Sequence, residues 1–408
     1  MNAARALAER LRALRAQSGT SAEAPARAPA HHPRRQRPGP PTTPTRIDDE
    51  TLAARLGGRA VRPGVVRVRE RLGAGIRHGA SPLSGRGLGE ALALAAGFAC
   101  GPPSRCVFMD TETTGLAGGT GTLVFVLGMA RFVDGVLVVD QLFLTGFEAE
   151  TAMLAEAQSV LADAETLVTF NGRSFDAPLL ATRFRLRGVA DPFARLRHVD
   201  LLHASRRLFA GRWPDCRLES VERRLLGVRR AGDLPGREAP QAWFDWLRHG
   251  DDAGLAAVGR HNRLDLLTLA ALPAALEASH SNPHAAGADP LACARARQRA
   301  FGAGEAECFA YLAAHRVRLD ARGLLELARL ARRRRDWPLA VGIWEELAAC
   351  GQTTAIEHLA KYHEHQRGDY RRASELTRAL LERAPNEQRH RRRADRLSAR
   401  LREPCRTD

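Results

Sequence analysis

RCVFMDTETTG, residues 105–115, begins as a short apolar run and ends with two acidic residues in a polar turn. The apolar run predicts a buried strand that ends near Asp110. Alternate side chains of a strand point to the same side of a sheet, so the carboxylates of Asp110 and Glu112 are expected to lie together. The segment therefore predicts a core strand that carries a pair of carboxylates at its end.

The sequence around this strand predicts an α/β fold. Apolar runs before and after the turn VDG, residues 133–135, indicate an antiparallel hairpin, and LVTF at 167–170 indicates a fourth strand. Helical patterns cover residues 151–163, 178–187 and 254–276. Three successive strands, followed by alternating helix and strand, indicate a mixed sheet flanked by helices.

Two more acidic residues are expected on separate core elements. Asp176 closes NGRSFD directly after the fourth strand, and Asp265 closes HNRLD on the long helix. His261 lies four residues before Asp265, about one turn away on the same helix face. Carboxylates that converge in apolar surroundings are costly without cations, and a pair of divalent metals can offset this cost while holding both reacting oxygens of a phosphodiester. The four acids therefore predict metal-assisted phosphoryl transfer.

DTETTG, N-x3-F-D and H-x3-D, in this order and spacing, resemble the three motifs of the DEDD 3′→5′ exonuclease superfamily, which has a ribonuclease-H-like fold. Over residues 100 to 275, stretches such as TFNGRSFDAPLL and HNRLDLLTL are similar to the YprB-type ribonuclease-H-like domain. The resemblance implies that two divalent cations, Mg²⁺ or Mn²⁺, are bound by the carboxylates of Asp110, Glu112, Asp176 and Asp265. It implies a catalytic role for these four residues and for His261.

The position of His261 departs from both subgroups of that superfamily. It matches the third-motif tyrosine of the tyrosine-type subgroup, four residues before the last Asp, whereas the histidine-type subgroup has its histidine where this chain has Arg260. No tyrosine of this chain lies before residue 311, so none can take its place. Two roles stay open for His261: general base for the attacking water, or a residue that only orients it.

Two functions from different classes follow from these motifs. The first is a metal-dependent 3′→5′ exonuclease that hydrolyses phosphodiester bonds of DNA or RNA by a two-metal mechanism, with Thr113, Asn171 and Phe175 as candidate substrate-binding residues. The second is a catalytically weak or inactive ribonuclease-H-like protein that binds nucleic acid, or acts as an adaptor, through basic flanks and helical repeats. The intact carboxylates favour the first function.

Positive charge is concentrated on both sides of the block that carries the motifs. Residues 1–100 carry 17 basic and 7 acidic side chains, residues 101–275 carry 20 and 21, and residues 299–408 carry 23 and 16. Arginine contacts with phosphates release counterions and give affinity without sequence preference, so the flanks suit a nucleic-acid partner. The alternative is a solvated, arginine-rich surface.

The chain is expected to divide into six segments. Residues 1–44 are rich in proline and arginine and predict a disordered basic tail. The other segments are an N-terminal extension at 45–100, the ribonuclease-H-like exonuclease domain at 101–278, a linker at 279–298, helical repeats at 299–385 and a basic C-terminal tail at 386–408.

The predicted repeats rest on an internal similarity. RDWPLAVGIWEEL, which begins at Arg335, and GDYRRASELTRAL, which begins at Gly368, align at a separation of 33 residues. This period and its helix-turn-helix texture resemble tetratricopeptide repeats, which indicates a candidate binding surface for a protein partner. The alternative is two unrelated amphipathic helix pairs.

Cysteine usage and hydropathy indicate the cellular compartment of the protein. Its seven cysteines are scattered and form no CxxC pair, which favours neither a disulfide framework nor a zinc site. The apolar stretch 122–129 is far shorter than the ~20 residues that span a bilayer. We expect a soluble cytoplasmic protein with no membrane partner.

Overall fold

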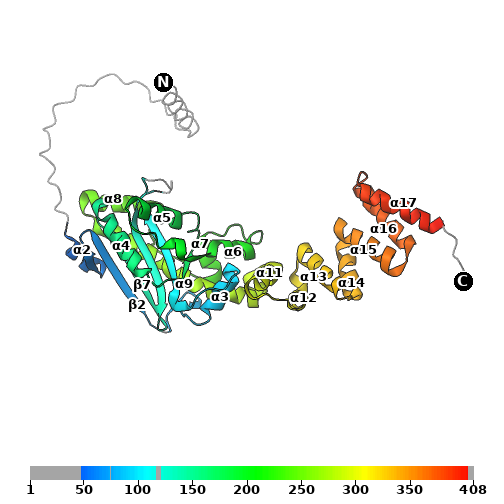
Figure 1. Ribbon diagram of the computed structural model, residues 1–408, viewed down its shortest axis with the longest axis horizontal. Coiled ribbons are helices and arrows are strands. Elements are labelled where there is room, and N and C mark those ends of the chain that lie inside the picture. The colour runs from blue at the N-terminus through cyan, green and yellow to red at the C-terminus, as the bar shows by residue number, and fades with distance from the viewer. Residues whose placement is uncertain (1–46, 74, 116–120, 403–408) are drawn as a thin grey trace, which may run out of the picture. The chain divides into compact units, whose positions relative to one another are not determined.

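The central feature of the fold is a seven-stranded sheet that contains the strand of the first two acidic residues (Figure 1). The computed structural model of the protein describes residues 47–73, 75–115 and 121–402. The predicted tail at 1–44 and the end of the chain from 403 onward lie outside the described residues.

Strand order across this sheet is β1-β2-β7-β6-β5-β8-β9. Neighbours from β1 to β5 pair antiparallel, whereas β8 pairs parallel with both β5 and β9. The prediction of a mixed α/β sheet is therefore confirmed. The strands are β1 (Arg59–Arg62), β2 (Val65–Leu72), β5 (Cys106–Thr113), β6 (Val124–Val133), β7 (Val136–Leu144), β8 (Thr166–Thr169) and β9 (Arg197–Asp200).

The β6–β7 hairpin has the turn that its sequence predicts. Val133 pairs with Val136, and the two residues between them, Asp134 and Gly135, have φ of 51° and 79°. Two successive left-handed residues give a hairpin turn whose twist matches that of its strands, and aspartate followed by glycine tolerates this backbone best. The hairpin places β6 beside the acidic strand β5.

Alternate residues of β5 enter two different apolar clusters. Val107 and Met109 pack with α4 (Glu150–Val160) and α5 (Asp176–Leu186). Cys106 and Phe108 pack with α3 (Leu88–Ala96), α6 (Leu201–Phe209) and the second half of α9 (Asp252–Ser281). Helices therefore cover both faces of the sheet (Figure 1). Asp110, in register with Cys106 and Phe108, lies on the face that α9 covers and contacts Asn262 of that helix.

Two glycines let α9 lie close to the sheet. A Cβ atom on Gly128 of β6 would come within 2.1 Å of Asn262 Oδ1, and one on Gly259 of α9 would come within 2.7 Å of Phe143 Cζ on β7. The start of α9 is capped by Asp251, whose side chain accepts hydrogen bonds from the backbone of Ala253 and Gly254. This close packing brings the third motif to the acidic strand.

Several elements were not predicted from the sequence. The segment 45–100, expected as an extension, supplies α2 (Asp49–Leu56), β1 and β2, and β2 pairs with β7 along its whole length. The expected linker contains α10 (Pro283–Ala286) and α11 (Pro290–Phe301). Strand β9, α6 and α8 (Ala239–His249) were also missed, because they contain four, nine and eleven residues, too few for a clear apolar period. Short elements complete this part: β3 (Arg77–His78), β4 (Ser81–Pro82) and α7 (Leu218–Val221).

The C-terminal part is entirely helical in the residues that the structure describes. A third apolar cluster, including Leu327, Ile343 and Trp344, joins the helices between residues 305 and 362, and each helix of this part packs against its neighbour in sequence. They are α12 (Glu305–Ala314), α13 (Ala321–Arg333), α14 (Trp337–Ala349), α15 (Thr353–Tyr362), α16 (Tyr370–Arg383) and α17 (Gln388–Arg402). The last of these lies in the expected basic tail. The tetratricopeptide assignment stays a prediction.

Among the described helices of the whole chain, none combines the length and the apolar character needed to cross a membrane.

Candidate active site

Asp110 and Glu112 lie at the end of β5, where they face the middle of α9. Asn262 of α9 donates a hydrogen bond from Nδ2 to Asp110 Oδ2 at 2.8 Å, and its Oδ1 accepts from Gln141 Nε2 of β7 at 2.9 Å. Asn262 is fully buried, so these bonds replace the water that its amide would otherwise bind. The amide connects the first motif to the third.

Asp176 is the first residue of α5, and its carboxylate accepts a hydrogen bond from the Thr111 hydroxyl on β5. The turn before it is held by Asp200, which accepts hydrogen bonds from the backbone N–H groups of Asn171 and Arg173 at 2.8 and 3.1 Å. Asn171 has a φ of 67°, a left-handed conformation that asparagine tolerates better than most residues. Asp200 therefore positions the second motif, and its charge adds to the effect of burial in raising the pKa of Asp176.

Asp265 and His261 lie on one face of α9, as their spacing predicts. His261 Nδ1 is 2.8 Å from Asp233 Oδ2, and His261 Nε2 is 3.7 Å from Asp265 Oδ2. A carboxylate only accepts hydrogen bonds, so Nδ1 carries the proton in the neutral imidazole. This contact directs Nε2 toward the acidic cluster, which we define as Asp110, Glu112, Asp176 and Asp265.

Burial raises the pKa of all four carboxyl groups of the acidic cluster. For Asp110 the carboxylates of Asp265, Asp176 and Glu112 raise the pKa further, to well above its usual range, against the hydrogen bond from Asn262. For Glu112, whose pKa is also raised well above its usual range, the charges of Asp265 and Asp176 add to the effect of burial. The structure thus brings the four predicted acids within electrostatic reach of one another, where their anionic forms need positive charge.

Arg230 supplies positive charge to Asp265. Its guanidinium donates to Asp265, to Asp233 at 3.2 Å and to both oxygens of Glu222 at 2.9 and 3.0 Å. Sequence reasoning missed Arg230, Asp233 and Asn262, because the first two lie in a Gly- and Pro-containing loop and the third is a single amide on a helix. Their only sequence signal is proximity to a motif: Asn262 lies inside HNRLD, and Asp233 lies three residues before the stretch GREAP.

A cavity of about 360 Å³ opens beside these residues and is lined by Arg230, Asp233, Gly236, His261 and Asp265, among others. Gly236 borders it closely, since a Cβ atom there would lie 3.6 Å from His261 Nε2. The cavity gives His261 and Asp265 access to a ligand. Two candidate substrate-binding residues flank the cluster: Thr113 donates to the carbonyl of Gly115 at 3.0 Å, and Phe175 exposes 52% of its surface.

The donor set of the acidic cluster suits hard divalent cations, because it consists of buried carboxylate oxygens and includes no thiolate. Within residues 47–73, 75–115 and 121–402, however, no group of three or more His, Cys, Asp and Glu side chains stands in an arrangement that holds a metal ion. Hydrogen bonds from Thr111, Asn262 and Arg230 engage three of the four carboxylates instead. Arg230 donates to Oδ1 of Asp265, and a carboxylate that accepts one such hydrogen bond can still bind a cation through its other oxygen.

Comparisons with known proteins find a family match over the part of the chain that carries the acidic cluster. Residues 107–277 match the family RNase_H_2, described as RNase_H superfamily. Over 288 residues the chain is 33% identical to "Uncharacterized protein YprB" of Bacillus subtilis (strain 168), which covers 67% of this chain and 68% of that protein. Among solved structures it is similar to the family B DNA polymerase from the hyperthermophilic archaeon Pyrobaculum calidifontis, with a TM-score of 0.36 and 16% identity over 69% of this chain. The chain spans 35% of that polymerase.

Proposed function

Because this chain belongs to the RNase_H superfamily as a YprB-type protein, we propose that it is a metal-dependent nuclease, and specifically a 3′→5′ exonuclease acting on DNA or RNA. The observation that carries the proposal is the convergence of Asp110, Glu112, Asp176 and Asp265 beside a cavity. Four carboxylates whose pKa values are all raised by burial are unfavourable for folding alone and favourable for holding divalent cations.

Divalent cations, when bound there, would stabilise the charge that develops on a reacting phosphodiester and activate the attacking water. The chain's own residues supply the placement. Asp110 and Glu112 are fixed by β5, Asp265 by α9, and Asp176 by the first turn of α5. His261, held through Nδ1 by Asp233, presents Nε2 as the acceptor that orients the attacking water or takes its proton.

A second candidate function is nucleic-acid binding with little or no hydrolysis. The observation that favours it is the ion pair between Arg230 and Asp265, which neutralises part of the acidic cluster without a metal. The charge of the flanking segments supports binding under either function.

The two functions are separated by incubating the purified full chain with single- and double-stranded DNA and RNA, labelled at the 5′ or the 3′ end, in Mn²⁺ or EDTA. A 3′→5′ exonuclease releases labelled mononucleotide at once from 3′-labelled strands and gives a descending ladder from 5′-labelled strands, in Mn²⁺ only. Binding without cleavage of any of these substrates supports the second candidate.

Asp110→Asn is the matched test of the acidic cluster. It keeps the shape of the side chain and removes its charge, so cleavage should stop while folding is retained. Asp134→Asn, in the exposed hairpin turn, is the control and should cleave at the wild-type rate. If Asp110→Asn cleaves as fast as Asp134→Asn, the acidic cluster is not the reaction centre.

A further inference from the structure

A second cavity, of about 570 Å³, lies on the flank of α9 opposite the acidic cluster. Its lining joins α2, β2, β7 and α9, and its residues include Leu56, Val68, Phe143, Ala256 and Arg260. Residues of a helix are rotated by about 100° from one to the next, so Arg260 and Arg263 cannot share the face of His261 and Asp265. The back cavity, as we name this space, is therefore distinct from the site described above.

Four arginines surround the back cavity, and all of them retain hydrogen-bond donors. Arg55 pairs through Nη1 with Asp252 at 2.9 Å, Arg69 with Asp140 at 2.7 and 3.0 Å, and Arg263 with Glu70 at 2.5 and 2.8 Å. Each of these pairs uses at most two of the five N–H donors of its guanidinium. Arg260 is exposed and has no acidic partner among the described residues.

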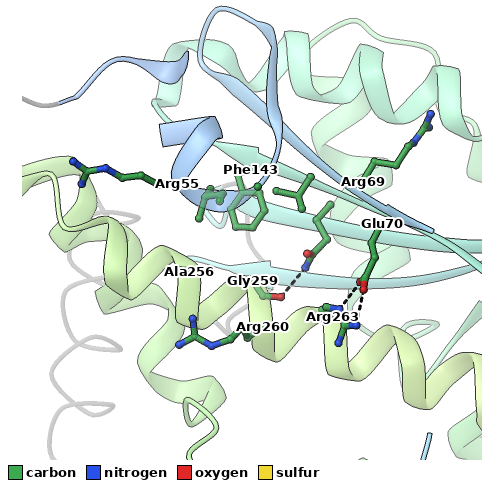
Figure 2. Close-up of a pocket in the computed structure, with 12 residues that line it drawn as sticks. Arg55, Arg69, Glu70, Phe143, Ala256, Gly259, Arg260 and Arg263 are labelled. Carbon is green, nitrogen blue, oxygen red and sulfur yellow. Dashed lines mark hydrogen bonds and ion pairs between the residues drawn. The ribbon is translucent and has the colours of Figure 1, made fainter. Parts of the chain in front are cut away.

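The arginines stand around an apolar wall (Figure 2). In this view Arg55 and Arg260 extend to the left of Phe143, whereas Arg69 and the pair of Glu70 with Arg263 lie to its right. Leu56, Val68 and Ala256 add apolar surface to the lining. A ligand that fits has an anionic end, a flat apolar body and a polar edge, and the cavity volume is that of ordinary small-molecule sites.

We propose that the back cavity binds a nucleotide, with its phosphate at Arg260 and its base against the apolar surface of Leu56, Val68 and Ala256, which are partly exposed. The planar guanidinium donates two parallel hydrogen bonds to two oxygens of a phosphate. An anion with a single acceptor atom cannot accept both. Glu70, whose side chain is partly exposed, offers an acceptor for the hydrogen-bonding edge of the base. The nucleotide comes either from solution as a monomer or from a strand of nucleic acid, since both present the same phosphate and base.

The back cavity is connected to the acidic cluster through buried hydrogen bonds. Gln141, which lines the cavity, donates to Asn262 at 2.9 Å and to the carbonyl of Gly259 at 2.8 Å, and Asn262 donates to Asp110. Gln141, at the buried base of the cavity, is thus two hydrogen bonds from Asp110. Nucleotide binding itself does not depend on hydrolysis, so this proposal stands if the proposed nuclease activity fails.

Binding is measured with the full chain in EDTA, where the anionic acidic cluster repels phosphates. The probes are a fluorescent adenosine monophosphate and a fluorescent single-stranded oligonucleotide, with inorganic phosphate as competitor. Arg260→Glu reverses the charge at the phosphate end, and Ala256→Phe fills the cavity without changing charge. Arg86→Glu, an exposed arginine with no acidic side-chain partner in the described residues, is the matched control.

Arg260→Glu and Ala256→Phe should each weaken binding at least about tenfold, and Arg86→Glu should change it by less than about twofold. If these two variants lose binding of the fluorescent adenosine monophosphate, the ligand is a free nucleotide. If they lose binding of the oligonucleotide alone, the ligand is a nucleotide of a strand. Melting curves verify that the variants fold. The proposal is overturned if neither probe binds saturably, or if Ala256→Phe binds like wild type and Arg260→Glu binds like Arg86→Glu.

Discussion

Arg230 donates to three acidic side chains at once, and one of them is Asp265 of the third motif. Only 11% of its side chain is exposed, and Glu222 exposes 1%. A buried carboxylate that loses its cationic partner keeps its desolvation cost, so a buried network of this kind responds strongly to removal of one member. At an exposed pair the same change has little effect, because water screens both charges.

Arg230→Gln should therefore lower the free energy of unfolding by about 3–5 kcal/mol in EDTA, since it leaves Glu222 and Asp265 without a cation. The control is Arg316→Gln, which breaks the half-exposed pair with Glu346 at 3.2 Å and should cost no more than about 1 kcal/mol. Guanidinium unfolding of both variants measures the difference. Equal losses would mean that Arg230 does not stabilise the acidic cluster.

His280, near the end of α9, is buried to 2% exposure and links stability to pH. Burial lowers the pKa of its imidazole to about 4, and the charges of Arg297 and Arg207 act in the same direction. The unfolded chain takes up this proton near pH 6.5. Between about pH 6.5 and 4 the unfolded state thus binds more protons, and the contribution of His280 to stability is lost as the pH falls.

His280→Gln should flatten this part of the stability profile, by on the order of 3 kcal/mol between about pH 7 and 4. His249→Gln, which replaces an exposed histidine at the end of α8, serves as the control and should keep the wild-type profile. Thermal unfolding at a series of pH values reports the effect. A wild-type slope in His280→Gln would show that His280 takes up its proton without unfolding.

At the scale of elements, the distance between β6 and α9 decides whether the first and third motifs meet. Gly128 pairs with Asp110 across the sheet and faces Asn262 of α9. The absence of a side chain at this position lets the amide of Asn262 reach the carboxylate of Asp110. The acidic cluster therefore depends on a glycine that carries no chemical group of its own.

Gly128→Ala should lower the free energy of unfolding by about 1–3 kcal/mol, because its Cβ atom would overlap Asn262 Oδ1 and push α9 from the sheet. The rate of any nucleic-acid cleavage should fall by more than the loss of folded protein explains, because Asp110 and Asp265 move apart. Gly342→Ala, where nothing lies within 4 Å of the new Cβ atom in α14, should instead stabilise by about 0.5–1 kcal/mol. An unchanged melting temperature and rate for Gly128→Ala would contradict the close contact.

At the scale of the whole molecule, the helical C-terminal part begins inside the core of the sheet domain. Cys293 and Ala288 belong to the same apolar cluster as Phe108, and Tyr311 donates from its hydroxyl to the carbonyl of His280 at 2.6 Å. Helix α11 packs against α3 and α6. The segment expected as a linker thus stabilises the sheet domain.

A chain that ends at residue 304 should fold cooperatively and retain any metal-dependent cleavage, because it keeps α11. A chain that ends at residue 280 should be far less stable, since it exposes Phe209, Leu272 and other members of that apolar cluster. Circular dichroism during thermal unfolding compares the two. Equal stability of both chains would show that α11 contributes no packing to the sheet domain.

The sequence by itself determined the α/β class, the acidic strand, the hairpin and the motif-bearing helices, because period-two and helical patterns and the Asp-Gly turn are local signals. It also identified four acids that the fold brings together. It did not reveal β2 as a sheet strand, since VVRVRERL carries three arginines. Two of them, Arg67 and Arg69, pair with Asp140 of β7, and this pairing is visible only in the fold.

Only the tertiary structure decided which hydrogen bonds and ion pairs those acidic residues and His261 form. Asn262 and Asp110 are 152 positions apart, Arg230 and Asp265 are 35 apart, and His261 and Asp233 are 28 apart. A side chain's partner across such separations depends on how β6, α9 and the loop before α8 pack, and no local pattern encodes that packing. The sequence therefore determined which groups are available for chemistry, whereas tertiary packing decided which cation, proton or hydrogen bond each of them receives.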